Sequence, residues 1–302
     1  MTIVNNQEKT YKQPSTGAIV GGTICGMIVQ GLANKTALRG ISPKIVKEIV
    51  EISKALTDDE FKTVQTAVDK TIEISGLSSK GVCMIRAGKE DSKQVKNILQ
   101  TAFNNNILTR HFPQIIKDHY VKMISSMITN GQNAAYVHDA KTILTSKKSL
   151  ALALFHETGH AMNHKLSTVG NMLRKSKMLG VLTLPIALIA LLKTKKAPNQ
   201  EPKGKTDKTT TFIKNNAGKL TFLTFIPLIL EEGLASHNGN IYAKKLLKPE
   251  LAKKVTRTNA IAISTYLILA TLSSIGIALG VKLKDSIAKP KLVKKRSRAE
   301  QQ

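Results

Sequence analysis

The sequence predicts a mainly α (α+β) protein in which a helical region outside the membrane is fused to transmembrane helices. Apolar residues come in long uncharged blocks, which are typical of membrane helices. Between these blocks they recur at three- and four-residue spacing, which indicates amphipathic helices, and only short segments have the composition of strands. The two cysteines, Cys25 and Cys83, exclude a disulfide framework and a cysteine-rich zinc site. Any metal must therefore be bound by histidine and carboxylate.

The chain is strongly basic. Its 302 residues include 46 Lys+Arg against 20 Asp+Glu, a formal net charge of +26. This charge excludes an acidic or neutral globule and requires an anionic partner or surface. The lysine-rich segments 193–219 and 282–302 are expected to contact an anionic lipid membrane. No nucleic-acid partner is expected, because the basic tail 282–302 has no interleaved aromatic residues and no recognisable binding module.

Three apolar blocks in the second half of the chain predict membrane segments. Residues 260–281 form an uncharged stretch that makes a helix about 33 Å long, enough to cross a hydrocarbon layer of roughly 30 Å. The shorter runs 178–192 and 220–230 predict the arms of a membrane hairpin, 178–230, with a lysine-rich loop between them. The alternative is that these two runs are buried core helices.

The first 34 residues are expected to be either a signal-like segment, which would be cleaved, or a membrane anchor, which would be retained. An uncharged stretch follows Lys9 and Lys12, and small residues near Ala33 fit a cleavage site of a signal peptide. Five glycines between positions 17 and 31 weaken this stretch as a helix. Both interpretations stay open.

The region 35–177 is expected to hold the chemistry. Its expected elements, in chain order, are helices at 42–56 and 57–74, a strand at 81–87, helices at 91–103 and 112–129, an extended segment at 134–145 and a helix at 148–165. Thr57 followed by Glu60 predicts a capping box at the start of the second helix.

The helix 148–165 contains the pattern HExxH, as His156, Glu157 and His160. Positions four apart share a helix face, so the two imidazoles can bind one zinc ion while Glu157 acts as a general base beside it. The alternative is a chance match, because the pattern also occurs in helices without catalytic function.

A third ligand is expected downstream. Leu166 occupies the position ten residues after His156, where a three-histidine site would need another histidine. The acidic pair Glu231 and Glu232, in the segment 231–259, directly follows an apolar run, and a zinc ion would neutralise its charge there. The alternative is that the pair is the solvated end of a helix.

The sequence AxxxFHETGHAMNH, followed by an apolar hairpin and Glu-x-x-Ala-Ser, resembles the integral-membrane gluzincin peptidases, which include the CAAX prenyl endoproteases and the bacterial heat-shock membrane proteases. The resemblance implies a zincin-like metallopeptidase domain and one Zn²⁺ per chain. It assigns three metal ligands, His156, His160 and Glu232, and the base Glu157. The segment 134–145 is similar to the family's substrate-pairing strand, with Ala134, Tyr136 and Ile143 as residues of that strand.

Two residues depart from the family pattern. Ser236 stands where the family usually has aspartate, and His164 lies eight positions after His156 where a histidine nine positions after is expected. His237, Tyr242 and His138 are the candidate donors to a developing oxyanion.

The expected function is that of a membrane-bound zinc metalloendopeptidase acting on a peptide or membrane-protein substrate. Loop lysines favour an extracytoplasmic active site by the positive-inside rule, although bacterial members of the family work on the cytosolic face. One alternative is a non-enzymatic basic membrane protein that binds anionic lipid. Another is a soluble zinc peptidase whose apolar runs form its core.

Overall fold

The fold was analysed in a computed structural model that describes residues 10–36, 42–106, 109–147, 151–197 and 200–293. Of the residues described, 78% are helical and few lie in strands, which confirms the mainly α prediction. It divides into two compact units, each of which is discontinuous in sequence. The first comprises 1–37, 179–224 and 269–302, and the second comprises 38–178 and 225–268.

The second unit holds most of the expected elements. They are α2 (Ser42–Lys54), α3 (Asp58–Ile74), β2 (Cys83–Ala87), α4 (Ser92–Asn105), α5 (Gln114–Thr129), β3 (Ala135–Val137), β4 (Thr142–Ser146), α6 (Leu154–Lys165) and α7 (Thr168–Ser176). The unit also includes parts of α10 (Ala217–Leu246) and α11 (Pro249–Ile287). The capping box of Thr57 and Glu60 begins α3, as its sequence predicts.

The strands form one three-stranded sheet of order β2-β4-β3, in which β4 is parallel to β2 and antiparallel to β3. The extended segment expected at 134–145 is therefore a hairpin, with a turn over 138–141 in which Lys141 has a positive φ of 51°. Ile143 lies in the central strand and is fully buried. Ile143 was expected in a strand that pairs with the substrate, but both edges of β4 are already paired, so its backbone is not open to a further strand. Within this hairpin the free edge belongs to β3, which carries Tyr136.

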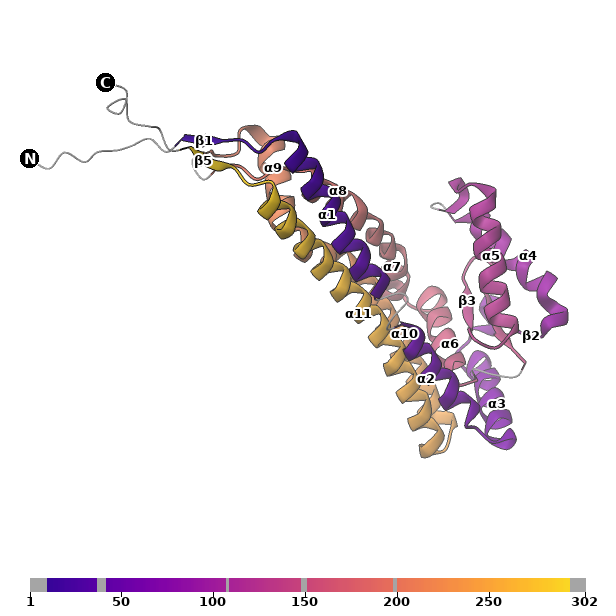
Figure 1. The fold of residues 1–302 in the computed structure, drawn as a ribbon. Coiled ribbons are helices and arrows are strands. Elements are labelled where there is room, and N and C mark those ends of the chain that lie inside the picture. Colours follow the sequence, from indigo (N-terminus) through magenta and orange to yellow (C-terminus); the bar gives the residue numbers. More distant parts are fainter. Residues whose placement is uncertain (1–9, 37–41, 107–108, 148–150, 198–199, 294–302) are drawn as a thin grey trace, which may run out of the picture. The chain divides into compact units, whose positions relative to one another are not determined.

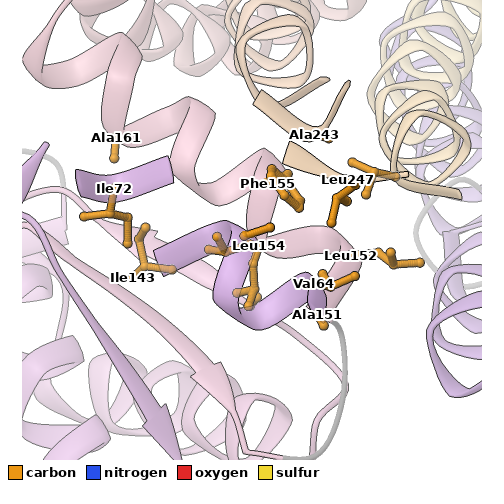
Figure 2. Close-up of a cluster of buried hydrophobic side chains, with 14 of the residues drawn as sticks. Val64, Ile72, Ile143, Ala151, Leu152, Leu154, Phe155, Ala161, Ala243 and Leu247 are labelled. Carbon is orange, nitrogen blue, oxygen red and sulfur yellow. The ribbon is translucent and has the colours of Figure 1, made fainter. Parts of the chain in front are cut away.

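A hydrophobic core holds α6 against its neighbours (Figure 2). Leu154 and Phe155 of α6 are buried in one cluster with Val64 of α3, Ile143 of β4 and Ala243 of α10. Of the helix expected at 148–165, α6 covers 154–165 after a 3-10 turn at Ala151–Ala153, and 148–150 lies outside the described residues. Since apolar side chains from three other elements surround the start of α6, the HExxH residues project from a rigid support.

The first unit contains α1 (Thr16–Lys35), α8 (Thr183–Leu192), α9 (Gly204–Asn215) and the remaining parts of α10 and α11. A short antiparallel pair joins β1 (Thr10–Lys12) to β5 (Lys291–Val293). Figure 1 labels these elements.

Glycines bring α1 close to α11. A Cβ at Gly26 would lie 2.8 Å from the carbonyl oxygen of Gly280, and one at Gly22 would lie 3.0 Å from that of Lys284. Side chains larger than hydrogen do not fit between helices at this separation, an arrangement common where membrane helices associate. Two of the five glycines expected to weaken this helix, Gly22 and Gly26, are thus part of its packing surface.

Three helical stretches of the described residues are long and apolar enough to cross a membrane: Thr16–Lys35, Thr168–Leu192 and Pro249–Ile287. The third includes the span expected at 260–281, and the second includes the hairpin arm expected at 178–192. The other arm, 220–230, is part of α10, which does not reach this criterion within the described chain. By length and composition, the chain fits a membrane protein.

Candidate metal centre

Two helices of the second unit supply the candidate ligands. His156, Glu157 and His160 lie in α6, and Glu232 lies 76 positions after His156 in α10. A glycine on each helix allows the backbones to meet. A Cβ at Gly159 would overlap the carbonyl of Ala235, and a Cβ at Gly239 would overlap that of Phe155. The close approach of these two helices therefore depends on the absence of side chains at both positions.

Three donor atoms converge between α6 and α10. Nε2 of His156 and Nε2 of His160 are 3.0 Å apart. Oε2 of Glu232 lies 3.1 Å from the first nitrogen and 3.3 Å from the second. His156 and Glu232 are buried, and His160 is partly buried. This group of nitrogen and oxygen donors could hold a metal ion.

The separations of these atoms fit tetrahedral zinc. Zinc bonds of 2.0–2.2 Å at tetrahedral angles place neighbouring ligand atoms roughly 3.3 Å apart, and the three observed separations are 3.0, 3.1 and 3.3 Å. Two imidazoles with one carboxylate are also a donor set typical of catalytic zinc, which keeps its fourth position open.

Both imidazoles are oriented through their second nitrogen. Nδ1 of His156 is 2.9 Å from Oγ of Ser236, and Nδ1 of His160 is 2.9 Å from Oε1 of Glu231. The side-chain amide of Asn163 donates to the same Glu231 oxygen at 3.1 Å. Bonds of this kind fix the ring so that Nε2 faces a metal. The two carboxylates of the acidic pair thus differ: Glu232 faces the Nε2 atoms, and Glu231 holds a ring in place.

Lys177 was missed by the sequence analysis. Its ammonium group forms ion pairs with Glu231 and, at 3.0 Å, with Glu232. The two glutamate side chains are 1% and 3% exposed, so they need a nearby positive charge. The sequence shows a lysine at the start of the apolar run that follows HExxH. It does not show that this lysine pairs with the two glutamates, because they lie more than 50 positions further along the chain.

The site as a whole favours positive charge at its centre. Burial opposes ionisation of Glu232, but hydrogen bonds with His156 and His160 outweigh burial and hold its pKa far below the ordinary value. Burial also opposes a charge on His160, yet its hydrogen bonds with Glu231 and Glu232 raise its pKa to about 10. A cation between these carboxylates, whether a proton or a metal ion, is therefore strongly stabilised.

Glu157 is placed for proton transfer. Its carboxylate accepts a hydrogen bond of 2.6 Å from the backbone N–H of Tyr136, at the free edge of β3. Burial raises the pKa of Glu157, while the nearby imidazoles of His160 and His156 lower it to a smaller extent. A raised carboxyl pKa is suited to accepting and returning a proton near neutral pH.

A cavity of about 420 Å³ is lined by His156, Glu157 and His160 of α6 and by Glu231 of α10. Of the three candidate oxyanion donors, His138 lines it, whereas His237 is exposed and Tyr242 packs against the hydrophobic core, and neither is among the residues that line it. Arg174 and Tyr266 also line the cavity and were not predicted. Ala134 and Tyr136 lie along one side of it.

His164 has a partner that the sequence did not indicate. Its Nδ1 lies 2.9 Å from the hydroxyl of Tyr136, and its ring meets that of His138 edge to face. His164 therefore contacts the turn-proximal part of the β3–β4 hairpin rather than the donor cluster.

Comparison of the chain with protein-family models, curated proteins and solved structures found no match.

Proposed function

We propose that this protein is a membrane-bound zinc metalloendopeptidase with a zincin-like domain, in which His156, His160 and Glu232 bind one Zn²⁺. The observation that carries the proposal is the convergence of their three donor atoms, 3.0 to 3.3 Å apart, beside the partly buried carboxylate of Glu157. The resemblance of HETGH and the downstream glutamate to the integral-membrane gluzincin peptidases supports the same assignment.

A zinc ion held by His156, His160 and Glu232 would lower the pKa of a bound water to about 7 and would polarise a peptide carbonyl. Glu157 accepts the proton of the attacking water and returns it to the leaving amine of the peptide. Its hydrogen bond to the N–H of Tyr136 holds the carboxylate in one orientation, which limits the reorganisation that proton transfer requires.

Three groups lining the cavity are suited to stabilise negative charge on the substrate carbonyl: Arg174, Tyr266 and His138. Tyr266 interacts with Glu232 and Glu157, so its hydroxyl lies near the reacting atoms. His138 is 3.1 Å from Asp139, which orients its ring. We assign the oxyanion role to Tyr266 or Arg174 before His138, because the Asp139 carboxylate already engages His138.

The substrate is a peptide or a membrane protein that presents an extended segment. The free edge of β3 adjoins the cavity and offers backbone groups for an additional strand. Pairing of this kind selects for an extended backbone more than for particular side chains. We place the enzyme in the cell membrane, with the site on the extracytoplasmic side, because the lysine-rich loops favour that orientation.

The test uses the full-length protein purified in mild detergent. The wild-type protein should contain one zinc per chain by elemental analysis and cleave a quenched fluorescent peptide. Glu157→Gln should retain zinc and lose at least a hundredfold in kcat. His160→Gln should lose both zinc and cleavage. Wild-type protein that binds no zinc after incubation with the metal would refute the proposal.

The ion pairs of Lys177 with both glutamates favour a second candidate, a basic membrane protein that binds anionic lipid without catalysis. In that case Lys177 and a protonated His160 together balance the charge of the acidic pair, and no metal is needed. Lipid binding without zinc uptake would support this candidate over the peptidase.

A further inference from the structure

The first unit contains a basic cavity unconnected with the candidate metal centre. It has a volume of about 500 Å³, and its polar lining includes Lys195, Lys214, Lys282 and Lys289. Asp285 is the one acidic residue that lines it. Lys195 follows α8, Lys214 lies near the end of α9, and Lys282 lies in the last part of α11. Positive charge is therefore gathered from segments far apart in the sequence.

Buried lysines already satisfy the carboxylate of Asp285. Lys214 is 5% exposed and pairs with it at 2.7 Å, and the buried Lys284 approaches the same oxygen at 3.3 Å. The ammonium group of Lys284 also donates to the backbone carbonyl of Ala190 at 3.4 Å. Lys195, Lys282 and Lys289, which are exposed, have no anionic partner among the described residues. Their charge is thus free to bind an anion.

The cavity has further features suited to an anion with an apolar tail. Ala217 and Gly218, the first two residues of α10, line it, and N–H groups in the first turn of a helix have no acceptor within the helix. Ala278 and Val281 of α11 form an apolar wall. Both residues belong to a candidate membrane span, so the acyl chains of a bound lipid can pack against this wall.

We propose that this cavity binds the phosphate group of an anionic phospholipid, with Lys195, Lys282 and Lys289 contacting the phosphate. Two lining residues, Lys195 and Ser286, are close in sequence to Leu192 and Ile287, at which two candidate spans end, and a span end lies at the depth of lipid headgroups. By the lysine content of its segments, the site faces the cytoplasmic leaflet, which carries anionic lipid.

The test compares two double variants with equal loss of charge. Lys282→Gln/Lys289→Gln removes two cavity lysines and leaves the buried pair of Lys214 and Asp285 intact. Lys205→Gln/Lys208→Gln removes two exposed lysines of α9 that do not line the cavity. Full-length proteins in neutral detergent are titrated with phosphatidylglycerol, with phosphatidylcholine and with inorganic phosphate. Bound lipid is counted by native mass spectrometry, and the melting temperature is recorded.

Wild type and the α9 variant should retain phosphatidylglycerol, while the cavity variant should bind it at least tenfold more weakly. Phosphatidylcholine should bind weakly to all three proteins. Stabilisation by millimolar inorganic phosphate, abolished in the cavity variant, would support the phosphate site and make free phosphate its ligand. Equal weakening in both variants would overturn the proposal, because it would show that binding depends on overall charge and not on this cavity. Since none of these readouts involves zinc or cleavage, they are independent of the proposed peptidase activity.

Discussion

The hydroxyl of Ser236 lies 2.9 Å from Nδ1 of His156, on the opposite side of the imidazole ring from Glu232. This hydrogen bond orients the ring so that Nε2 faces the other two donor atoms. Ser236 therefore orients this candidate ligand through the ring nitrogen that faces away from the other donor atoms.

Replacing Ser236 with alanine should therefore weaken zinc binding about tenfold, because partners of this kind contribute 10- to 100-fold to metal affinity. Affinity is measured by competition with a chromophoric chelator. Ser273→Ala is the control, since Ser273 is also buried but bonds to Asn34 in the first unit. Equal zinc affinity in Ser236→Ala and wild type would mean that Ser236 does not orient a ligand.

Replacing each of two glycines near the site with alanine should change the stability of the protein in opposite directions. Gly159→Ala would drive a Cβ into the carbonyl of Ala235, so α6 and α10 must separate. We expect a loss of about 1–3 kcal/mol in stability and a loss of zinc binding. Gly233 also lies in α10, next to Glu232, but a Cβ there meets nothing within 4 Å. Gly233→Ala should therefore preserve zinc binding and stabilise the helix by about 0.5–1 kcal/mol.

Thermal melting with and without zinc tests the predictions for Gly159→Ala and Gly233→Ala. A Gly159→Ala protein that melts and binds zinc like wild type would show that α6 and α10 are not in close contact.

Lys177→Met should destabilise the metal-free protein, because it leaves two buried glutamates without their ammonium partner. Breaking a buried ion pair from one side costs about 3–5 kcal/mol, and the partial exposure of Lys177 places the expected loss at the lower end. Saturating zinc should restore much of the melting temperature, since the metal supplies positive charge to Glu232. The exposed neighbour Lys175, changed to Met, is the control. A melting temperature that does not respond to zinc in the Lys177 variant would contradict this account.

His164 should contribute to the acid sensitivity of the second unit. Burial lowers its pKa to about 4, with a smaller contribution from the positive charges of Arg174 and Lys165. The unfolded chain binds a proton at this histidine at about pH 6.5, while the folded protein does so only near pH 4. As the pH falls through this window, the unfolded state is favoured, so His164 makes the folded protein less stable.

When the pH is lowered from 6.5 to 4, the free energy of unfolding should therefore fall less in His164→Gln than in wild type. Urea unfolding in detergent at several pH values measures this difference. The same change at the exposed His119 is the control for the removal of a histidine. An unchanged pH slope in His164→Gln would contradict the prediction.

The packing of α1 predicts that its glycines are not equivalent. Gly26→Ala places a Cβ 2.8 Å from the carbonyl oxygen of Gly280 and against Leu191, whereas a Cβ at Gly21 meets nothing within 4 Å. The first change should lower the melting temperature by several degrees, and the second should leave it equal or slightly higher.

Intact-mass measurement of the purified protein separates the two interpretations of residues 1–34, because an anchor is retained and a signal is removed.

Local patterns in the sequence determined much of this protein. Hydropathy located the span 260–281 and a possible span near the amino terminus, and three- and four-residue spacing located the helices around residues 42–74. The HExxH spacing placed His156 and His160 on one face of α6, because helical periodicity alone dictates that relationship. Such features depend on neighbours a few positions apart, so they can be read along the chain.

The tertiary structure decided which distant residues meet. It separated Glu232 from Glu231, gave Ser236 and Lys177 their partners, and made the extended segment a hairpin whose central strand buries Ile143. These relationships depend on where the backbones of α6 and α10 come together, which the small size of Gly159 and Gly239 permits. Periodicity describes only the face of a single helix, and it carries no information on which other helix that face will contact.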